Sequence, residues 1–204
     1  MICIINYGVG NITSILNMLK KIGVPARITS NETDIRQAEK IILPGVGHFD
    51  YCMQQLKKAP FFDQLQLRVL EEKIPVLGVC VGSQMLMESS EEGKEPGLGW
   101  LAGKVVKFNK DQLPAGYKIP HMGWTDVQPN GNNPLYEGIA EPRFYFVHSY
   151  HIQPVDPAHV TGLADYGGRF TASVGSGHIQ GVQFHPEKSH KFGMRLYGNF
   201  AKHF

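Results

Sequence analysis

Residues 75–82 read Pro-Val-Leu-Gly-Val-Cys-Val-Gly, an apolar run that ends at Cys80 with Gly78 and Gly82 on either side of it. The run has the composition of a buried strand, and residues 82–89 after it predict a helix. A cysteine at such a junction has the form of a nucleophile elbow, where small neighbours allow a strained backbone and the close approach of other chain. The stretch therefore predicts an α/β sheet with a reactive thiol at the end of one strand.

Short apolar runs alternate with helical patterns before this stretch, which predicts strands at residues 2–5, 26–29 and 40–43. The helical patterns have apolar side chains three or four residues apart. They consist of Ile12, Ile15, Leu16, Leu19 and Ile22; of Phe49, Met53 and Leu56; and of Phe61, Phe62, Leu65, Val69 and Leu70. Strands that alternate with helices favour a parallel sheet covered on both faces.

The second half of the chain has a different pattern, because turn residues crowd 92–103, 109–116 and 129–133. We predict hairpins, a mixed or antiparallel part of the sheet, and a last helix over residues 189–203. The β-like runs are 104–108, 144–152, 160–166, 170–174 and 179–184. Residues 1–204 are thus expected to form a single α/β domain with one open, mostly parallel mixed sheet and helices on both faces.

The composition bounds the function only loosely. Lys and Arg total 20 against 18 Asp and Glu, so the formal charge of +2 gives no support to a nucleic-acid-binding face. Cys3, Cys52 and Cys80 are too few, and odd in number, for a disulfide framework, which favours a reducing, cytoplasmic compartment. Residues 1–6 do not resemble a signal peptide, and no run of about 18 apolar residues predicts a membrane span.

A second motif, Gln-Phe-His-Pro-Glu-Lys-Ser at residues 183–189, lies at the end of the last predicted strand. His185 is of the residue type that accepts a thiol proton, and Glu187 projects to the same side of an extended segment. Pro186 fixes φ between them. A surface histidine beside a solvated glutamate is the ordinary alternative, and the elbow at Cys80 favours the catalytic interpretation.

A third motif, Pro-Gly-Val-Gly at residues 44–47, follows the predicted strand at 40–43. Active sites of open parallel sheets form at the carboxyl ends of adjacent strands. This loop is therefore placed to offer a backbone N–H to an oxyanion. Each motif alone has a structural explanation, since the loop resembles an ordinary turn and a free cysteine is most often a buried core residue.

Two other patterns carry little weight. Gly8-Val9-Gly10 follows the first strand as in a dinucleotide-binding fingerprint, but Thr13 stands at the third glycine position. His148 and His151 are three residues apart in one predicted strand and would project to opposite faces. We therefore expect no shared metal ion and no cofactor.

The three motifs together resemble the class I (triad) glutamine amidotransferases, which implies a flavodoxin-like fold. Several longer stretches, in the family's order from residue 6 to residue 189, resemble the glutaminase subunits of imidazole glycerol phosphate synthases. These stretches are Asn-Tyr-Gly-Val-Gly-Asn at 6–11, Pro-Gly-Val-Gly-His-Phe at 44–49, Pro-His-Met-Gly-Trp at 120–124, Tyr-Phe-Val-His-Ser-Tyr at 145–150, and residues 183–189.

The resemblance implies a role for each matched residue. Cys80 would attack the side-chain amide of glutamine, His185 would carry the proton to ammonia, and Glu187 would hold the imidazole. The N–H of Val81 and one from the loop Gly45-Val46-Gly47 would form the oxyanion hole. Gln84 and Glu92 would contact bound glutamine. The remaining implied contacts are backbone groups of His148, Ser149 and Tyr150.

The resemblance also implies a partner. The matched subunits form a heterodimer with a (β/α)8-barrel cyclase, which uses the ammonia to make imidazole glycerol phosphate and an aminoimidazole carboxamide ribotide in histidine biosynthesis. The positions that match the family's interface are Asn11, Trp124, Tyr145 and Lys188.

Three other functions stay open at this level. A paralogous glutaminase subunit would supply ammonia to another synthase, such as one that amidates surface sugars. Ser83 and Thr125 depart from the family's frequent methionine and asparagine, which leaves the partner open. A free-standing hydrolase of the same fold and a non-catalytic binding subunit are the remaining alternatives.

Overall fold

A parallel block of five strands forms one half of the sheet, in the order β2-β1-β3-β4-β12. The computed structural model describes residues 1–204. The apolar runs of the sequence become these strands because every residue of β1, β4 and β12 is buried between two layers of helices. Their bounds are β1 (Ile2–Ile5), β2 (Ala26–Thr29), β3 (Lys40–Gly45), β4 (Val76–Cys80) and β12 (Ile179–Val182).

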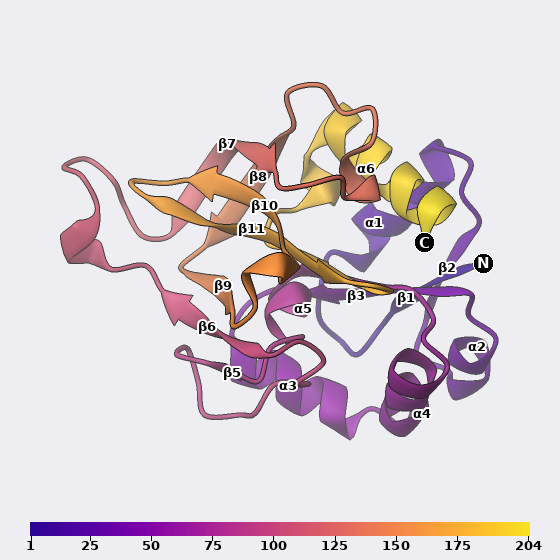
Figure 1. The fold of residues 1–204 in the computed structure, drawn as a ribbon. Coiled ribbons are helices and arrows are strands. Elements are labelled where there is room, and N and C mark those ends of the chain that lie inside the picture. Colours follow the sequence, from indigo (N-terminus) through magenta and orange to yellow (C-terminus); the bar gives the residue numbers. More distant parts are fainter.

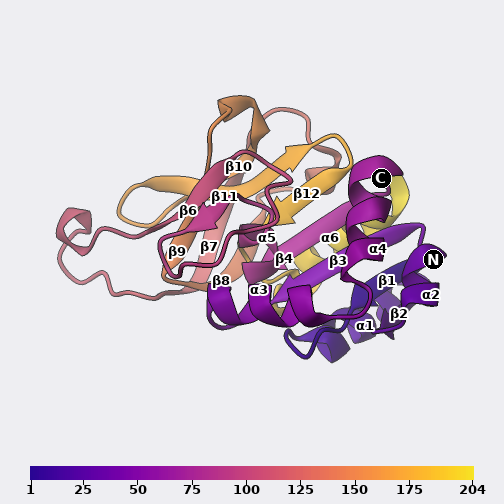
Figure 2. The ribbon, with the colours of Figure 1, turned by 90° about the horizontal axis from the view of Figure 1, so that it is seen from below.

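The other half of the sheet is antiparallel and continues in the order β12-β11-β10-β7-β8. A branch leaves it where β9 pairs with β11 and β6, and β6 in turn pairs with β5. Figures 1 and 2 show this half extending away from the parallel strands. The bounds are β5 (Ser89–Ser90), β6 (Gly103–Lys107), β7 (His121–Pro129), β8 (Arg143–His148), β9 (Tyr150–Pro154), β10 (Val160–Asp165) and β11 (Arg169–Ser176).

Helices cover both faces of the parallel strands. In Figure 1, α1 and α6 lie above these strands, and α3 and α4 lie below them. None of the helices is long and apolar enough to span a membrane. The bounds are α1 (Ile12–Lys21), α2 (Glu32–Arg36), α3 (Phe49–Lys58), α4 (Phe62–Gln66), which continues as a π-helical stretch (Leu67–Glu71), α5 (Val81–Gln84) and α6 (His190–His203). The predicted open mixed sheet with helices on both faces is confirmed.

The helix predicted for residues 82–89 is wrong beyond its first turn, since α5 spans Val81–Gln84. The carbonyls of residues 85–88 do not continue the helical ladder. All four accept backbone N–H groups from the segment 97–101, at distances from 2.8 to 3.1 Å. These long-range bonds satisfy the carbonyls in place of a second helical turn.

Other boundaries also differ from the prediction. The run 144–152 is two strands, because the chain pairs with β7 up to His148 and with β6 from Tyr150 onward. β3 continues through Pro44 to Gly45, where it pairs only with β4 and the missing proline N–H costs no hydrogen bond to β1. β7 and α2 were not predicted.

Candidate active site

Cys80 lies at the tip of a strained turn between β4 and α5. Its backbone has φ 54° and ψ −114°, a region that residues with a side chain rarely adopt. The turn packs tightly against β3, since a Cβ added to Gly82 would lie 1.9 Å from the carbonyl oxygen of Leu43. A Cβ added to Gly45 would lie 2.4 Å from the Gly82 nitrogen. The glycines around Cys80 therefore permit the close approach that the elbow needs.

His185 and Glu187 form a buried pair beside this turn. Nδ1 of His185 donates to Oε1 of Glu187 at 2.7 Å, and Nδ2 of Asn11 donates to the same oxygen at 3.0 Å. The His185 backbone N–H donates to the carbonyl of Tyr145 at 2.9 Å, and Ser189 Oγ donates to the His185 carbonyl at 2.6 Å. Hydrogen bonds thus hold the backbone of His185 and the Nδ1 side of its ring, while the buried Nε2 has no partner in the protein.

The charges around His185 favour its protonated form. Burial alone lowers the pKa of the imidazole, but the Cys80 sulfur and the Glu187 carboxylate outweigh burial and raise the pKa to about 10. Burial raises the pKa of Glu187, yet the hydrogen bonds from His185 and Asn11 and the charge of His185 hold it below its ordinary value. Such an arrangement suits an imidazolium that faces a thiolate.

The loop 44–47 lies next to Cys80 because β3 and β4 are parallel neighbours, with Gly45 opposite Cys80. Side chains hold two of its carbonyls. Tyr7 donates its hydroxyl to the Pro44 oxygen at 2.5 Å, and the Cys52 thiol donates to the Val46 oxygen at 3.3 Å. The loop is thereby anchored beside the sulfur.

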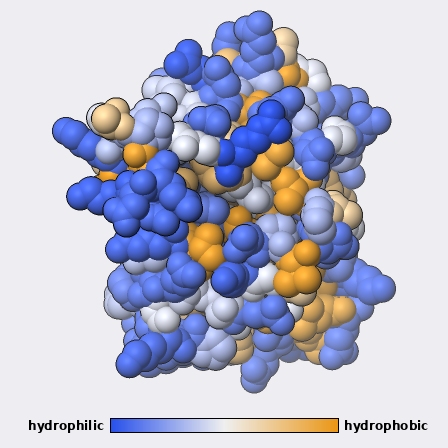
Figure 3. Space-filling view, turned by 60° about the vertical axis from the view of Figure 1, so that its left-hand side comes forward, coloured by the Kyte–Doolittle hydropathy of each residue, from blue (hydrophilic) through white to orange (hydrophobic).

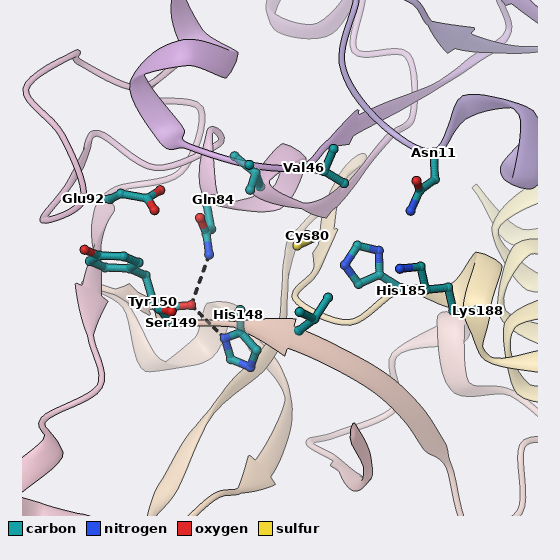
Figure 4. Close-up of a pocket in the computed structure, with 13 residues that line it drawn as sticks. Asn11, Val46, Cys80, Gln84, Glu92, His148, Ser149, Tyr150, His185 and Lys188 are labelled. Carbon is teal, nitrogen blue, oxygen red and sulfur yellow. Dashed lines mark hydrogen bonds between the residues drawn. The ribbon is translucent and has the colours of Figure 1, made fainter. Parts of the chain in front are cut away.

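These groups surround a cavity of about 330 Å³. Figure 4 shows Cys80 at its centre, with His185, Lys188 and Asn11 on one side and the glutamine, glutamate and tyrosine side chains on the other. The volume suits a small ligand. The lining residues are Asn11, Val46, Gly47, Cys80, Val81, Gln84, Glu92, Val147, His148, Ser149, Tyr150, His185 and Lys188.

The side of the cavity opposite His185 offers acceptors. Gln84 Nε2 donates to the Tyr150 carbonyl at 3.1 Å and to Gln183 Oε1 at 3.1 Å. Oε2 of Glu92 accepts the backbone N–H of Phe49 at 2.8 Å, which places the carboxylate at the first turn of α3. The other Glu92 oxygen has no hydrogen-bond partner in the protein.

Most of the residues singled out from the sequence come together here, but four do not line the cavity. Glu187 is bonded to the far side of the His185 ring, at Nδ1, and Gly45 is the last residue of β3. Trp124 and Tyr145 face each other across β7 and β8 outside the cavity, with ring centroids 6.2 Å apart.

Lys188 and Asn11, expected at a partner interface, reach the site itself. The Lys188 ammonium lies 5.7 Å from the Tyr145 ring centroid and also lines the cavity.

Trp124 stacks on His190 with an 8° angle between the rings, and it is half-exposed beside exposed Met122. Figure 3 shows apolar residues gathered in the middle of one face and surrounded by hydrophilic ones.

Two residues of the site were not predicted from the sequence. Val147 lines the cavity, and Nε2 of Gln183 lies 3.9 Å from the Cys80 sulfur. Gln183 stands two residues before His185 on an extended segment, a spacing that could have indicated it. The placement of His148 and His151 on one strand was wrong, since they lie on β8 and β9 and both rings lie near Phe108.

Residues 3–204 match the family model described as glutamine amidotransferase class-I, so the chain belongs to this family. Among curated proteins, it is 52% identical over 203 residues to imidazole glycerol phosphate synthase subunit HisH 2 of Pseudomonas aeruginosa, covering 99% of each chain. The protein of the same name from Methanococcus maripaludis is 49% identical, again over 99% of each chain. Within the class, the chain is thus a member of the HisH family.

A solved structure gives independent support for the fold. The structure of PurLQS from Thermotoga maritima superimposes with a TM-score of 0.72 at 19% identity, covering 98% of this chain and 96% of that one. The shared architecture persists although few residues are identical.

Proposed function

We propose that this chain hydrolyses glutamine to glutamate and ammonia, with residues 1–204 acting as one glutamine amidotransferase domain. The observation that carries the proposal is the Cys80 elbow beside the His185–Glu187 pair in a cavity of about 330 Å³. The site needs no cofactor for this reaction. The free thiol suits the reducing cytoplasm, which we propose as the compartment.

In the proposed reaction, the Cys80 thiolate attacks the side-chain amide carbon of glutamine. The N–H of Val81 and an N–H of the loop 44–47 stabilise the oxyanion. The carbon–nitrogen bond then breaks, and ammonia leaves with a proton from Nε2 of His185. Water, which gives its proton to the same nitrogen, adds to the γ-glutamyl thioester and releases glutamate, while Glu187 keeps the ring oriented.

The substrate's ends are assigned by charge. Glu92 and the free Gln84 oxygen would accept hydrogen bonds from the α-ammonium group. Backbone groups of residues 148–150 would bind the α-carboxylate side. This orientation directs the side-chain amide toward Cys80.

The partner would be the cyclase subunit of imidazole glycerol phosphate synthase, which consumes the ammonia in histidine biosynthesis. The proposal rests on relatives that carry the name of this synthase at about half identity and full length. Trp124 and Met122 would meet the cyclase, and Tyr145 and Lys188 would connect that contact to the cavity. The loop 44–47 would change between two states when the partner binds.

Covalent labelling tests the chemistry. The glutamine-like electrophile 6-diazo-5-oxo-L-norleucine should modify Cys80 and leave Cys3 and Cys52 untouched, as shown by peptide mass spectrometry. Excess glutamine should protect Cys80. Equal modification of all three cysteines, or no protection, would contradict the proposed glutamine site.

A further inference from the structure

The backbone carbonyl of Tyr150 sets the direction of every hydrogen bond around it. It accepts from Gln84 Nε2 at 3.1 Å and from His148 Nδ1 at 2.8 Å, and Figure 4 shows both bonds. A carbonyl oxygen carries no hydrogen, so both partners must donate. This requirement fixes the orientation of the Gln84 amide and the tautomer of His148.

The histidine side of the network then has a single proton arrangement. His148 is buried, and burial holds its pKa well below the ordinary value, so the ring is neutral and its Nε2 accepts. His121 Nδ1, 2.9 Å away, must therefore donate to it. Burial lowers the pKa of His121 to about 4, so its Nε2 accepts from Thr125 Oγ1 at 2.8 Å.

The amide side is determined in the same way. Gln84 donates both hydrogens of its amide, one to the Tyr150 carbonyl and one to Gln183 Oε1, each at 3.1 Å. The Gln84 oxygen is consequently left as an acceptor beside the cavity. Gln183 is fully buried, and with its oxygen used it directs Nε2 toward the Cys80 sulfur at 3.9 Å.

Packing keeps the outer ring of this network in place. His121 is stacked between Tyr166 and Phe146, with ring centroids 4.0 and 5.0 Å away and interplanar angles of 25° and 23°. A ring held on both faces cannot turn over without displacing its neighbours. The His121 side chain thus presents Nδ1 to His148 permanently.

We infer that His121 and Gln183 are positioning residues for glutamine hydrolysis: a hydrogen-bond chain from Thr125 to Cys80 holds the Gln84 oxygen toward the cavity and a Gln183 N–H toward the sulfur. The inference rests on the proposed function and deepens it. Neither residue lines the cavity. His121 acts through His148, and Gln183 acts through Gln84 and Cys80. Replacing either residue should therefore change a different kinetic parameter.

Two substitutions at one position test the histidine side. His121→Asn keeps a donor near the place of Nδ1, whereas His121→Leu removes it. We expect His121→Leu to raise the KM for glutamine about tenfold and His121→Asn to stay within about threefold of the wild type. Alkylation of Cys80 by iodoacetamide, which needs no glutamine pocket, should be the same in both. Equal KM values for the two variants would overturn the inference.

The amide side has its own variant. Gln183→Glu keeps an acceptor for Gln84 but replaces the N–H beside the sulfur with a negative charge. We expect iodoacetamide to alkylate Cys80 at least tenfold more slowly in this variant, with a larger loss in kcat than change in KM. An unchanged alkylation rate would contradict the role of Gln183.

A measurement without substrate separates this inference from the proposed function. Nitrogen-15 NMR of the wild-type protein should show both His121 and His148 as neutral Nδ1–H tautomers. An Nε2–H tautomer at either ring would overturn the network whatever the enzyme does. A wild-type protein with these tautomers and no glutamine hydrolysis would instead contradict the proposed function alone.

Discussion

At the scale of single residues, the chemistry depends on how His185 keeps its proton. Its Nδ1 is paired with Glu187, and its Nε2 faces the cavity with no protein partner. The pKa of about 10 means that the imidazolium is present at neutral pH and is lost as the pH rises through that value. A proton for the leaving ammonia is therefore available over the whole neutral range.

Replacing Glu187 with glutamine should change the pH dependence of the reaction. Burial and Cys80 act on the imidazole as before, but the hydrogen bond and the charge of Glu187, which both raise the pKa of His185, are weakened or lost, so the pKa falls. The alkaline limb of the kcat/KM profile, expected near pH 10 in the wild type, should move down by more than one pH unit. Profiles of both proteins between pH 6 and 11 check this. Superimposable alkaline limbs would show that Glu187 does not set the protonation of His185.

At the scale of elements, the site depends on the close approach of β3, β4 and α5. Only glycine fits at their contact points, because any larger residue would clash there. β3 passes against the elbow at the glycines, and α5 begins directly after Cys80. The approach places the loop 44–47 beside the sulfur. The geometry of catalysis is thus a consequence of backbone packing.

Gly82→Ala should therefore destabilise the fold. The added Cβ would meet the Leu43 oxygen at 1.9 Å, and relief requires β3 or the elbow to move, at a cost of about 3 kcal/mol. Gly177→Ala is the matched control, since its φ is +54° but no atom lies within 4 Å. That change should cost only about 1 kcal/mol of backbone strain. Urea unfolding of both variants measures the difference, and equal losses would refute the steric explanation.

The sequence predicted most of the parallel half because strands such as β1 and β4 are buried on both faces and so are continuously apolar. β7 was not predicted from the sequence. Its outward face carries Met122 and Trp124, while Gly123 and Thr125 point inward, so the strand lacks the usual alternation of apolar inward and polar outward residues. The early end of α5 was unpredictable locally, since the carbonyls of residues 85–88, which follow the helix, accept N–H groups from residues 97–101.

The candidate site was predictable to a similar degree. Cys80, His185 and Glu187 stand in recognisable motifs, so their neighbourhood could be inferred. The chain through His121 and Gln183 depends on hydrogen bonds between residues up to 103 positions apart, which no local pattern records.

At the scale of the whole molecule, the cavity lies beside a surface that β7 and β8 form, with exposed Met122 and Trp124. The outward residues of β7 and β8 pair in register, Met122 with Val147 and Trp124 with Tyr145. Val147 also lines the cavity, so this face is continuous with the site. A partner seated on it would lie next to the point at which ammonia forms.

Trp124→Ala should weaken partner binding without disturbing basal hydrolysis. A half-exposed tryptophan is a typical interface anchor, and its loss should raise the Kd for the cyclase about 30-fold, or about 2 kcal/mol. Val155→Ala, at an apolar side chain that is 73% exposed, is the control and should leave the Kd unchanged. Calorimetric titration measures both. An unaltered Kd for Trp124→Ala would place the interface elsewhere.

The decisive measurement is glutamate release from glutamine, by the purified chain alone and then with a histidine-pathway cyclase and its ribotide ligand. We expect a low rate that rises steeply with the liganded cyclase and falls at least about 10³-fold in Cys80→Ala. No glutamate release in either condition, or a Cys80→Ala variant as active as the wild type, would contradict it.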